Sequence, residues 1–214
     1  GTDRKLGVTP FLVVLSSPSG GGKTTIAKAL LTARHDVVYS VSATTRPRRP
    51  KERNSVDYYF LTPDEFRAKV EASEFLEWAA YGGYLYGTLA SKIEKIMELG
   101  KHAVLDIEVV GARKVRELLA NVVSIFILPP SAGVLRERLS LRSIEGVADL
   151  KVRLQHAVDE VGAATEYDYV VVNDEFGACV DRLRSIVFAE RARLRAARPT
   201  TDKILETFKK GNPR

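Results

Sequence analysis

The loop at residues 17–24 constrains this chain more than any other stretch, because three consecutive glycines and a Gly-Lys-Thr triplet lie between two contrasting segments. The apolar run 11–15 before it predicts a buried strand, and residues 25–31 after it predict a helix. In such a strand–turn–helix unit, backbone N–H groups converge on phosphate oxygens at the positive end of the helix. The loop therefore predicts a nucleoside triphosphate site within an α/β fold, although Ser17 stands where glycine is usual.

Within this loop, Lys23 is expected to reach the β- and γ-phosphates, and the Thr24 hydroxyl is expected to hold Mg²⁺. The expected nucleotide-binding residues are Ser17, Pro18, Ser19, Gly20, Gly21, Gly22, Lys23, Thr24 and Thr25. An ordinary glycine-rich turn is the alternative interpretation. The coincidence of strand, turn, Gly-Lys-Thr and helix favours the phosphate site.

The net charge of +6 is concentrated at the carboxyl end of the chain. Residues 191–214 hold eight basic and two acidic side chains, so the preceding 190 residues carry equal numbers of each sign. A nucleic-acid-binding face is expected as a basic stripe on the folded body. We therefore interpret residues 191–214 as a solvated basic tail, with little order in its final ~20 residues, and we expect no nucleic-acid partner.

The longest apolar runs, such as residues 122–128, have the length of a strand, whereas a membrane span needs roughly 20 residues. Cys179 is the only cysteine, which excludes a disulfide or a cysteine-based zinc site within one chain. We therefore expect a cytoplasmic protein with no membrane partner.

Strand-like and helix-like segments alternate along the chain, which predicts a parallel sheet with crossover helices. Strands are expected at residues 37–42, 103–107, 122–128 and 169–172, and helices at 90–99, 112–119, 131–141, about 150–161 and a long closing segment through Leu194. A β-rich insertion at about residues 42–88 interrupts this pattern. The expected division is a core of residues 1–41 and 89–190, the insertion 42–88, and the tail 191–214.

The insertion has its own turn and capping signals. Residues 57–61 predict a strand, and Thr62-Pro63-Asp64-Glu65 is a capping box with proline at the first helical position, so a short helix should run to about Ala72. The Gly82-Gly83 pair between two apolar runs predicts a hairpin.

The insertion also concentrates groups that bind anions and bases. Residues 42–49 hold three arginines beside several hydroxyls, and Glu77 lies in a hydrophobic strand next to Trp78. Arginine forks suit a phosphate, and a carboxylate suits a base with two adjacent N–H donors. Guanine offers such a pair at N1 and N2, whereas adenine has an acceptor at N1. A solvated loop explains the arginines equally well alone, but the nearby phosphate loop favours binding.

From residue 13 to about residue 190, the motifs and their spacing resemble the guanylate kinase family. The resemblance implies a P-loop fold of three α/β/α layers with a central parallel sheet, a β-rich GMP-binding insertion and a helical lid at about residues 138–153. It implies transfer of the γ-phosphoryl group of ATP to GMP or dGMP, giving ADP and GDP, with ATP and GMP as substrates and Mg²⁺ as cofactor.

The resemblance also implies roles for individual residues. Those for the GMP phosphate are Arg46, Arg49, Tyr58 and Tyr86, and those for guanine are Ser42, Glu77 and Thr88. Asp106 and Glu108 would face both substrates, and the role of Asp106, toward Mg²⁺ or substrate, stays open. The implied catalytic residues are Lys23, Arg142 and Arg153, and the implied further ATP contacts are Arg138, Arg142 and Asn173. Leu141-Arg142-Ser143-Ile144 stands where the family often has Gly-Arg-Gly.

Two other functions are compatible with much of this pattern. A guanylate-kinase-like scaffold domain would bind phosphopeptides through the same arginines, but such domains typically lack an intact phosphate loop and carry proline at the position of Ser42. A related kinase acting on a ribose bisphosphate would share the fold and the loop, but it would not need Glu77 to read guanine.

Overall fold

A computed structural model describes residues 7–19, 21–140 and 147–210. Its larger sheet has five parallel strands in the order β2-β7-β1-β8-β9. Their bounds are β1 (Leu12–Ser16), β2 (Val37–Tyr39), β7 (His102–Asp106), β8 (Val122–Leu128) and β9 (Tyr169–Val172). The predicted parallel sheet is confirmed, although β2 ends three residues earlier than expected. Because β1 is central, the loop that follows it opens at the carboxyl edge of the sheet, between β7 and β8.

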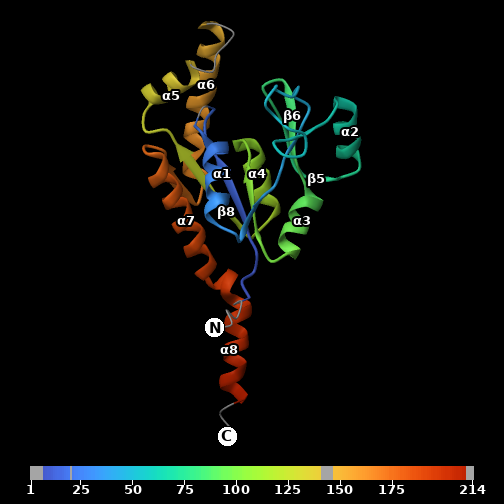
Figure 1. Ribbon diagram of the computed structural model, residues 1–214, viewed down its shortest axis with the longest axis vertical. Helices are drawn as coiled ribbons and strands as arrows, with labels where there is room; N and C mark the ends of the chain where they lie inside the picture. Colours follow the sequence, from blue (N-terminus) through green and yellow to red (C-terminus); the bar gives the residue numbers. More distant parts are fainter. Residues whose placement is uncertain (1–6, 20, 141–146, 211–214) are drawn as a thin grey trace.

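Helices cover both faces of this sheet and form the predicted three layers (Figure 1). On one face, α1 (Lys23–Ala33) and α7 (Phe176–Ala192) pack against Val13 and Leu15 of β1. On the other face, α3 (Ala90–Glu98) and α4 (Val109–Leu118) pack against Leu12 and Val14. Successive side chains of a strand point to opposite faces, so a strand buried on both faces is continuously apolar.

A second, mixed sheet is built from the insertion, in the order β4-β3-β6-β5. Its strands are β3 (Ala43–Thr44), β4 (Tyr59–Phe60), β5 (Phe75–Tyr81) and β6 (Tyr84–Leu89), and α2 (Pro63–Glu71) lies between β4 and β5. The predicted capping box forms between Thr62 and Glu65, and Gly82 and Gly83 turn the predicted hairpin with positive φ angles. This sheet lies beside the core, where β5 packs on α3 and α4 (Figure 1).

Three short elements connect β8 to β9: α5 (Ala132–Ser140), α6 (Val147–Gly162) and the 3₁₀ helix η1 (Ala163–Glu166). Leu135 and Leu139 of α5 pack against Ala157 of α6, which joins the two helices beyond the carboxyl edge of the sheet (Figure 1). The expected lid, residues 138–153, lies partly on this pair and partly on residues 141–146, which are outside the described residues.

The prediction of a poorly ordered tail is wrong. The long closing helix breaks at Arg193, which has an extended backbone, and α8 (Leu194–Lys210) follows (Figure 1). The first turns of α8 are held by the body: Ala196 is buried, and its carbonyl accepts from the Thr9 N–H at 2.8 Å. The buried Glu190 carboxylate also binds Arg195 at 2.7 Å. The number of charges in this segment did not predict the helix, because the helix is stabilised by contacts with residues far away in the sequence, such as that of Ala196 with Thr9. Neither α8 nor any other helix of the described residues is long and apolar enough to cross a membrane.

His102 fixes the start of β7, the strand that delivers Asp106 to the carboxyl edge. Its ring is buried 4.0 Å from the ring of Phe11, and its Nδ1 accepts a hydrogen bond from the Phe11 N–H at 3.2 Å. Burial lowers the pKa of His102 to about 4, against the opposing influence of Asp36. The folded protein therefore holds this histidine neutral at pH values where the unfolded chain protonates it.

We expect this histidine to make folding sensitive to mild acid. Its pKa in the unfolded chain is about 6.5, so the free energy of unfolding should fall as the pH drops from about 6.5 to 4, and between pH 7 and 4.5 the loss from this residue should be about 2 kcal/mol. Urea unfolding at both pH values should show that His102→Asn reduces the pH dependence by that amount. His35→Asn, at an exposed histidine, is the matched control. Equal pH dependence in wild type and His102→Asn would contradict this account.

Candidate functional site

The phosphate loop depends on glycine at two described positions. Gly22, the N-cap of α1, has a φ of 86°, which residues with a side chain rarely adopt. At Gly21, a Cβ would lie 2.7 Å from the Ser17 side chain and 2.9 Å from the Pro18 carbonyl oxygen. Ser17 fits at the first position because it is buried and its hydroxyl donates to that same carbonyl at 3.0 Å. Gly20 lies outside the described residues.

Lys23 is paired with two carboxylates at the carboxyl end of β7. Its Nζ lies 2.5 Å from Glu108 Oε1 and 3.6 Å from Asp106 Oδ1. Burial acts to lower the pKa of Lys23, but the charges of Glu108 and Asp106 outweigh burial and raise it above its ordinary value. The Lys23 ammonium therefore stays charged at the N-terminus of α1, where it can bind an anionic ligand.

Asp106 and Thr24 form a second polar contact beside this pair. The Thr24 hydroxyl donates to Asp106 Oδ2 at 2.6 Å, while the buried Asp106 Oδ1 has no hydrogen-bond partner within the described part of the chain. Burial raises the pKa of Asp106, and Lys23 and Thr24 oppose that rise. A hydroxyl beside an unpartnered carboxylate oxygen suits Mg²⁺, which takes few protein ligands when phosphates and waters supply the rest.

A metal ion between Thr24 and Asp106 would need further ligands from a bound substrate. Among the described residues, no group of three or more His, Cys, Asp and Glu side chains could hold a metal ion by itself. Thr24 and Asp106 offer two oxygen ligands, and phosphate oxygens and waters would have to supply the rest of an octahedral Mg²⁺ set.

Glu77 is a buried carboxylate with a defined orientation. It is 6% exposed, and its Oε1 accepts a hydrogen bond from the buried Thr88 hydroxyl at 2.7 Å. Burial raises the pKa of Glu77, and the Thr88 hydroxyl partly opposes the rise. A Cβ at Gly111 would lie 2.6 Å from Glu77 Oε2, so only glycine lets the carboxylate approach α4 this closely. Sequence analysis gave Gly111 no role, because the helix was predicted to begin one residue later, at residue 112, whereas α4 begins at Val109.

Helix α4 brings this carboxylate and the phosphate loop together. Glu108, the partner of Lys23, is the N-cap of α4, and Gly111, which lies against Glu77, is in the first turn of the same helix. The two halves of the site, which come from different sheets, therefore share one rigid element.

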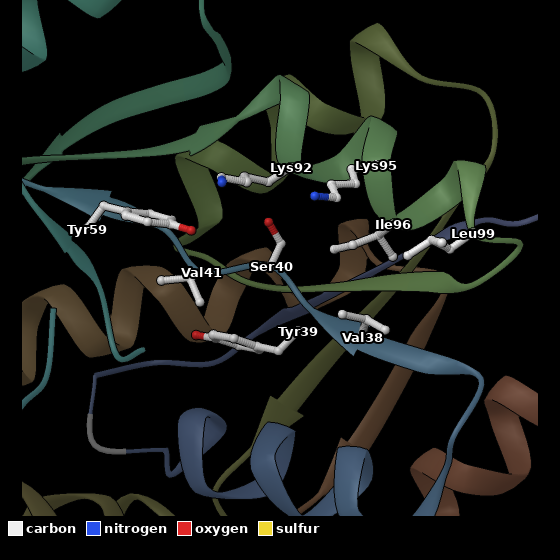
Figure 2. A pocket seen from close by; sticks show the side chains of 9 residues that line it. All are labelled: Val38, Tyr39, Ser40, Val41, Tyr59, Lys92, Lys95, Ile96 and Leu99. Carbon is white, nitrogen blue, oxygen red and sulfur yellow. The ribbon is translucent and has the colours of Figure 1, made fainter. Parts of the chain in front are cut away.

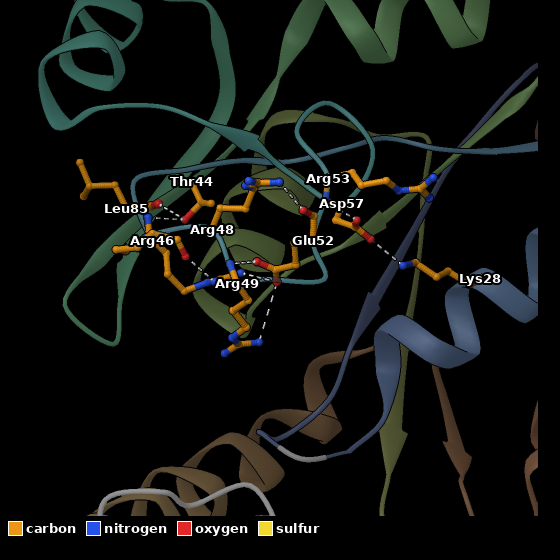
Figure 3. Close-up of polar contacts among 10 residues, drawn as sticks. Lys28, Thr44, Arg46, Arg48, Arg49, Glu52, Arg53, Asp57 and Leu85 are labelled. Carbon is orange, nitrogen blue, oxygen red and sulfur yellow. Dashed lines mark hydrogen bonds and ion pairs between the residues drawn. The ribbon is translucent and has the colours of Figure 1, made fainter.

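The arginine cluster of the insertion is organised around Glu52 (Figure 3). Arg46 Nη2 lies 2.7 Å from Glu52 Oε1, and the Arg49 N–H donates to Glu52 Oε2 at 2.8 Å. The Arg49 guanidinium is 3.9 Å from the same carboxylate, and its side chain is 72% exposed. Burial acts to raise the pKa of Glu52, but Arg46 and the Arg49 N–H hold it below its ordinary value. Glu52 was not among the predicted site residues.

Two phenols lie beside these arginines, and a buried hydroxyl precedes β3. The Arg46 guanidinium is 5.5 Å from the ring centre of Tyr58, and the Tyr58 and Tyr86 rings are 6.1 Å apart, edge to face. Burial raises the pKa of Tyr58 to about 12. Ser42 is buried at the start of β3, and its Oγ has no hydrogen-bond partner among the residues that are described. The Tyr58 phenol is thus a protonated donor at neutral pH.

The expected adenine and lid contacts are only partly described. Asn173 donates from Nδ2 to the Gly21 carbonyl at 3.1 Å, so its side chain braces the phosphate loop. Arg138 lies close by, with its Nη2 3.5 Å from the Asn173 carbonyl oxygen. Arg142 is outside the described residues, and for Arg153 the backbone within α6 is described but the side chain is not.

A cavity of about 230 Å³ lies apart from these groups, between the β2–β3 connection and α3 (Figure 2). It is lined by Val38, Tyr39, Ser40, Val41, Tyr59, Lys92, Lys95, Ile96 and Leu99, none of which was predicted to contact either nucleotide.

Known proteins match both the sequence and this arrangement. The protein-family model described as "Guanylate kinase" matches residues 10–190. A guanylate kinase of Thermotoga maritima is 48% identical over 183 residues, covering 86% of this chain and 88% of the relative, and one of the Onion yellows phytoplasma is 43% identical over 204 residues, covering 94% and 96%. The crystal structure of guanylate kinase from Anaplasma phagocytophilum has a TM-score of 0.76 at 34% identity and covers 89% of this chain and 91% of that one. This chain belongs to the guanylate kinase family.

Proposed function

We propose that this chain transfers the γ-phosphoryl group of ATP to GMP, giving ADP and GDP, with Lys23 at the transferred group and Glu77 at the guanine. The chain is an ATP:GMP phosphotransferase by its family, and dGMP is a further acceptor of the same shape. The division into a core (1–41 and 89–190) and a GMP-binding insertion (42–88) belongs to this proposal.

The observation that carries the proposal is the buried, oriented carboxylate of Glu77, which lies against helix α4, the helix whose N-cap Glu108 pairs with Lys23. A carboxylate held in a desolvated pocket can accept from N1–H and N2–H₂ of guanine, and an unmatched base would leave it unpaired. The phosphate loop supplies the second half of the reaction, because its N–H groups and Lys23 suit the phosphates of ATP.

Catalysis would rest on positioning and charge. The acceptor is a phosphate oxygen that is already ionised at neutral pH, so no strong general base is needed. Arg46, Arg49, Tyr58 and Tyr86 would hold the GMP phosphate, and Lys23 with Arg142 and Arg153 would neutralise the transferred group.

Metal and adenine contacts complete the proposed site. Thr24 and Asp106 would hold Mg²⁺, which when bound neutralises charge on the β- and γ-phosphates. Arg138 and Asn173 would contact ATP, and Ser42, Thr88 and Glu108 would complete the GMP side.

A coupled assay with ATP and five acceptors tests the function directly. GMP and dGMP should be phosphorylated, and AMP, IMP and CMP should be much poorer acceptors. A scaffold domain would transfer to none of them, and a ribose-bisphosphate kinase would act on its sugar substrate and ignore GMP. Either result would overturn the proposal.

Lys23→Ala should lower kcat by about 10²- to 10³-fold, because it removes the cation nearest to the developing charge. Steady-state kinetics with GMP and ATP measure the effect. Lys101→Ala is the matched control, since Lys101 precedes β7 at the end of that strand opposite to Asp106, and it should turn over normally. Turnover of Lys23→Ala close to that of the wild type would show that another group faces the transferred phosphoryl.

Arg49→Ala should weaken GMP binding by about 2 kcal/mol, or about 30-fold in Kd, through loss of a charge-assisted contact to the phosphate. Isothermal calorimetry with GMP measures this change. Arg48→Ala provides the control, because Arg48 donates to the Glu52 backbone carbonyl and not to its carboxylate. An unchanged GMP affinity in Arg49→Ala would place the phosphate site elsewhere.

Glu77→Gln should lower kcat/KM for GMP and narrow the gap between GMP and IMP, which in the wild type can reach ~10⁴-fold. IMP lacks the N2 amino group, so the preference for GMP over IMP depends on a group that accepts a hydrogen bond from N2. Glutamine is a poorer acceptor for this purpose than glutamate. The amide can still accept from Thr88, so the fold should persist. Kinetics with both acceptors, and with Glu74→Gln as an exposed control ahead of β5, test this prediction. Wild-type discrimination in Glu77→Gln would remove Glu77 as the guanine-reading residue.

A further inference from the structure

Glu160 connects helix α6 to the phosphate loop. Its Oε2 accepts a hydrogen bond from the Ser19 N–H at 2.9 Å, although the two residues are 141 positions apart. Burial raises the pKa of Glu160, and the Ser19 N–H opposes that rise. One backbone donor of the loop is therefore held by a side chain of the helix that continues the expected lid.

Tyr81 reaches the same point from the other sheet. It is the last residue of β5 and is half-buried. Burial raises the pKa of its phenol, the nearby charges of Glu108 and Glu160 raise it further, and the Ser19 side chain opposes that rise. The phosphate loop and helix α6 thus meet at the Glu160 carboxylate, and the end of β5 lies close to it.

Aromatic rings continue this contact into the arginine cluster. The Tyr81 ring lies 6.5 Å from the Tyr86 ring, edge to face, and Tyr86 lies 6.1 Å from Tyr58, which the Arg46 guanidinium covers. Rings in such edge-to-face contact attract one another beyond their burial of surface. Neighbouring side chains therefore link Arg46 to Tyr81, and the Tyr81 phenol lies near Glu160, which accepts from the Ser19 N–H.

We propose that Tyr81 and Glu160 are positioning residues that couple GMP binding to the shape of the phosphate loop. This inference rests on the proposed function of the two sites that they connect. A phosphate held by Arg46 and the Tyr58 and Tyr86 hydroxyls fixes those rings, and the fixed rings hold Tyr81 against Ser19 and Glu160. The loop is then ordered before ATP arrives, so GMP tightens ATP binding.

A thermodynamic cycle measures this coupling directly. The Kd of a non-hydrolysable ATP analogue is determined by calorimetry with and without saturating GMP, and their ratio is the coupling factor. In the wild type we expect GMP to tighten the analogue by about fivefold or more. In Tyr81→Phe, which keeps the ring and removes the hydroxyl, and in Glu160→Ala, the factor should fall to within about twofold of unity.

Conservative and neighbouring substitutions separate coupling from simple loss of structure. Glu160→Gln retains an acceptor for the Ser19 N–H and should keep most of the coupling. Tyr84→Phe, on the opposite strand of the hairpin, and Asp159→Asn, exposed beside Glu160, should keep all of it. A wild-type coupling factor in both Tyr81→Phe and Glu160→Ala would overturn the proposal.

The same titrations distinguish this failure from failure of the proposed function. GMP added alone to the wild-type protein must bind if the insertion is an acceptor site. Absence of that binding would overturn the function and the coupling together. Normal GMP binding with unchanged coupling in the variants would leave the phosphotransferase assignment intact and remove only the roles of Tyr81 and Glu160.

Discussion

The pairing of Lys23 with the carboxylates that follow β7 depends on the register of two central strands. Leu15 lies opposite Asp106 in the parallel ladder between β1 and β7, so the phosphate loop and the acids leave the sheet at the same level. A buried ammonium without a partner would cost several kcal/mol, so this register is part of what makes the site stable. Glu108 is also the N-cap of α4, and the first turn of that helix lies against Glu77. Strand β7 thus places the Glu77 side of the site, and its neighbour β1 places the phosphate loop.

Carboxylates of the protein itself bind the donor groups that are expected to bind phosphates. Glu108 holds Lys23, Glu52 holds Arg46, and Glu160 holds the Ser19 N–H. A substrate phosphate would therefore exchange one anion for another, and the site would not have to desolvate a new, unpaired charge on the protein. The net free energy of binding a phosphate would be the difference between the phosphate contact and the carboxylate contact that it replaces. The affinity for phosphate would therefore be moderate, while the carboxylates hold the donors in place before substrate binds.

The parts of the fold that local patterns determine could be predicted from the sequence. The apolar runs at 122–128 and 169–172 became β8 and β9 with the expected bounds, and the capping box opened α2. The phosphate loop was found because its chemistry lies within eight consecutive residues. Glu160 and Gly111 were missed because each acts on a residue distant in the chain, and no local motif marks a helix carboxylate that will meet Ser19. Helix α8 was missed because composition described its charges and not the buried contact of Ala196. The roles of the substrate-binding residues remain predictions.

The contacts between the two sheets differ in strength, and this difference constrains how the insertion can move. Glu77 and β5 pack on α4 through a buried contact at Gly111, so a shift of β5 along α4 would bring the Glu77 carboxylate against a residue that carries a side chain. On the arginine side, the insertion reaches the core through the pair of Lys28 with Asp57 at 2.9 Å (Figure 3), and the Lys28 side chain of that pair is 56% exposed. An exposed pair of this kind contributes at most about 1 kcal/mol. We therefore expect any closure around a substrate to keep the Glu77 side of the insertion on α4 and to bring the arginine cluster toward the phosphate loop.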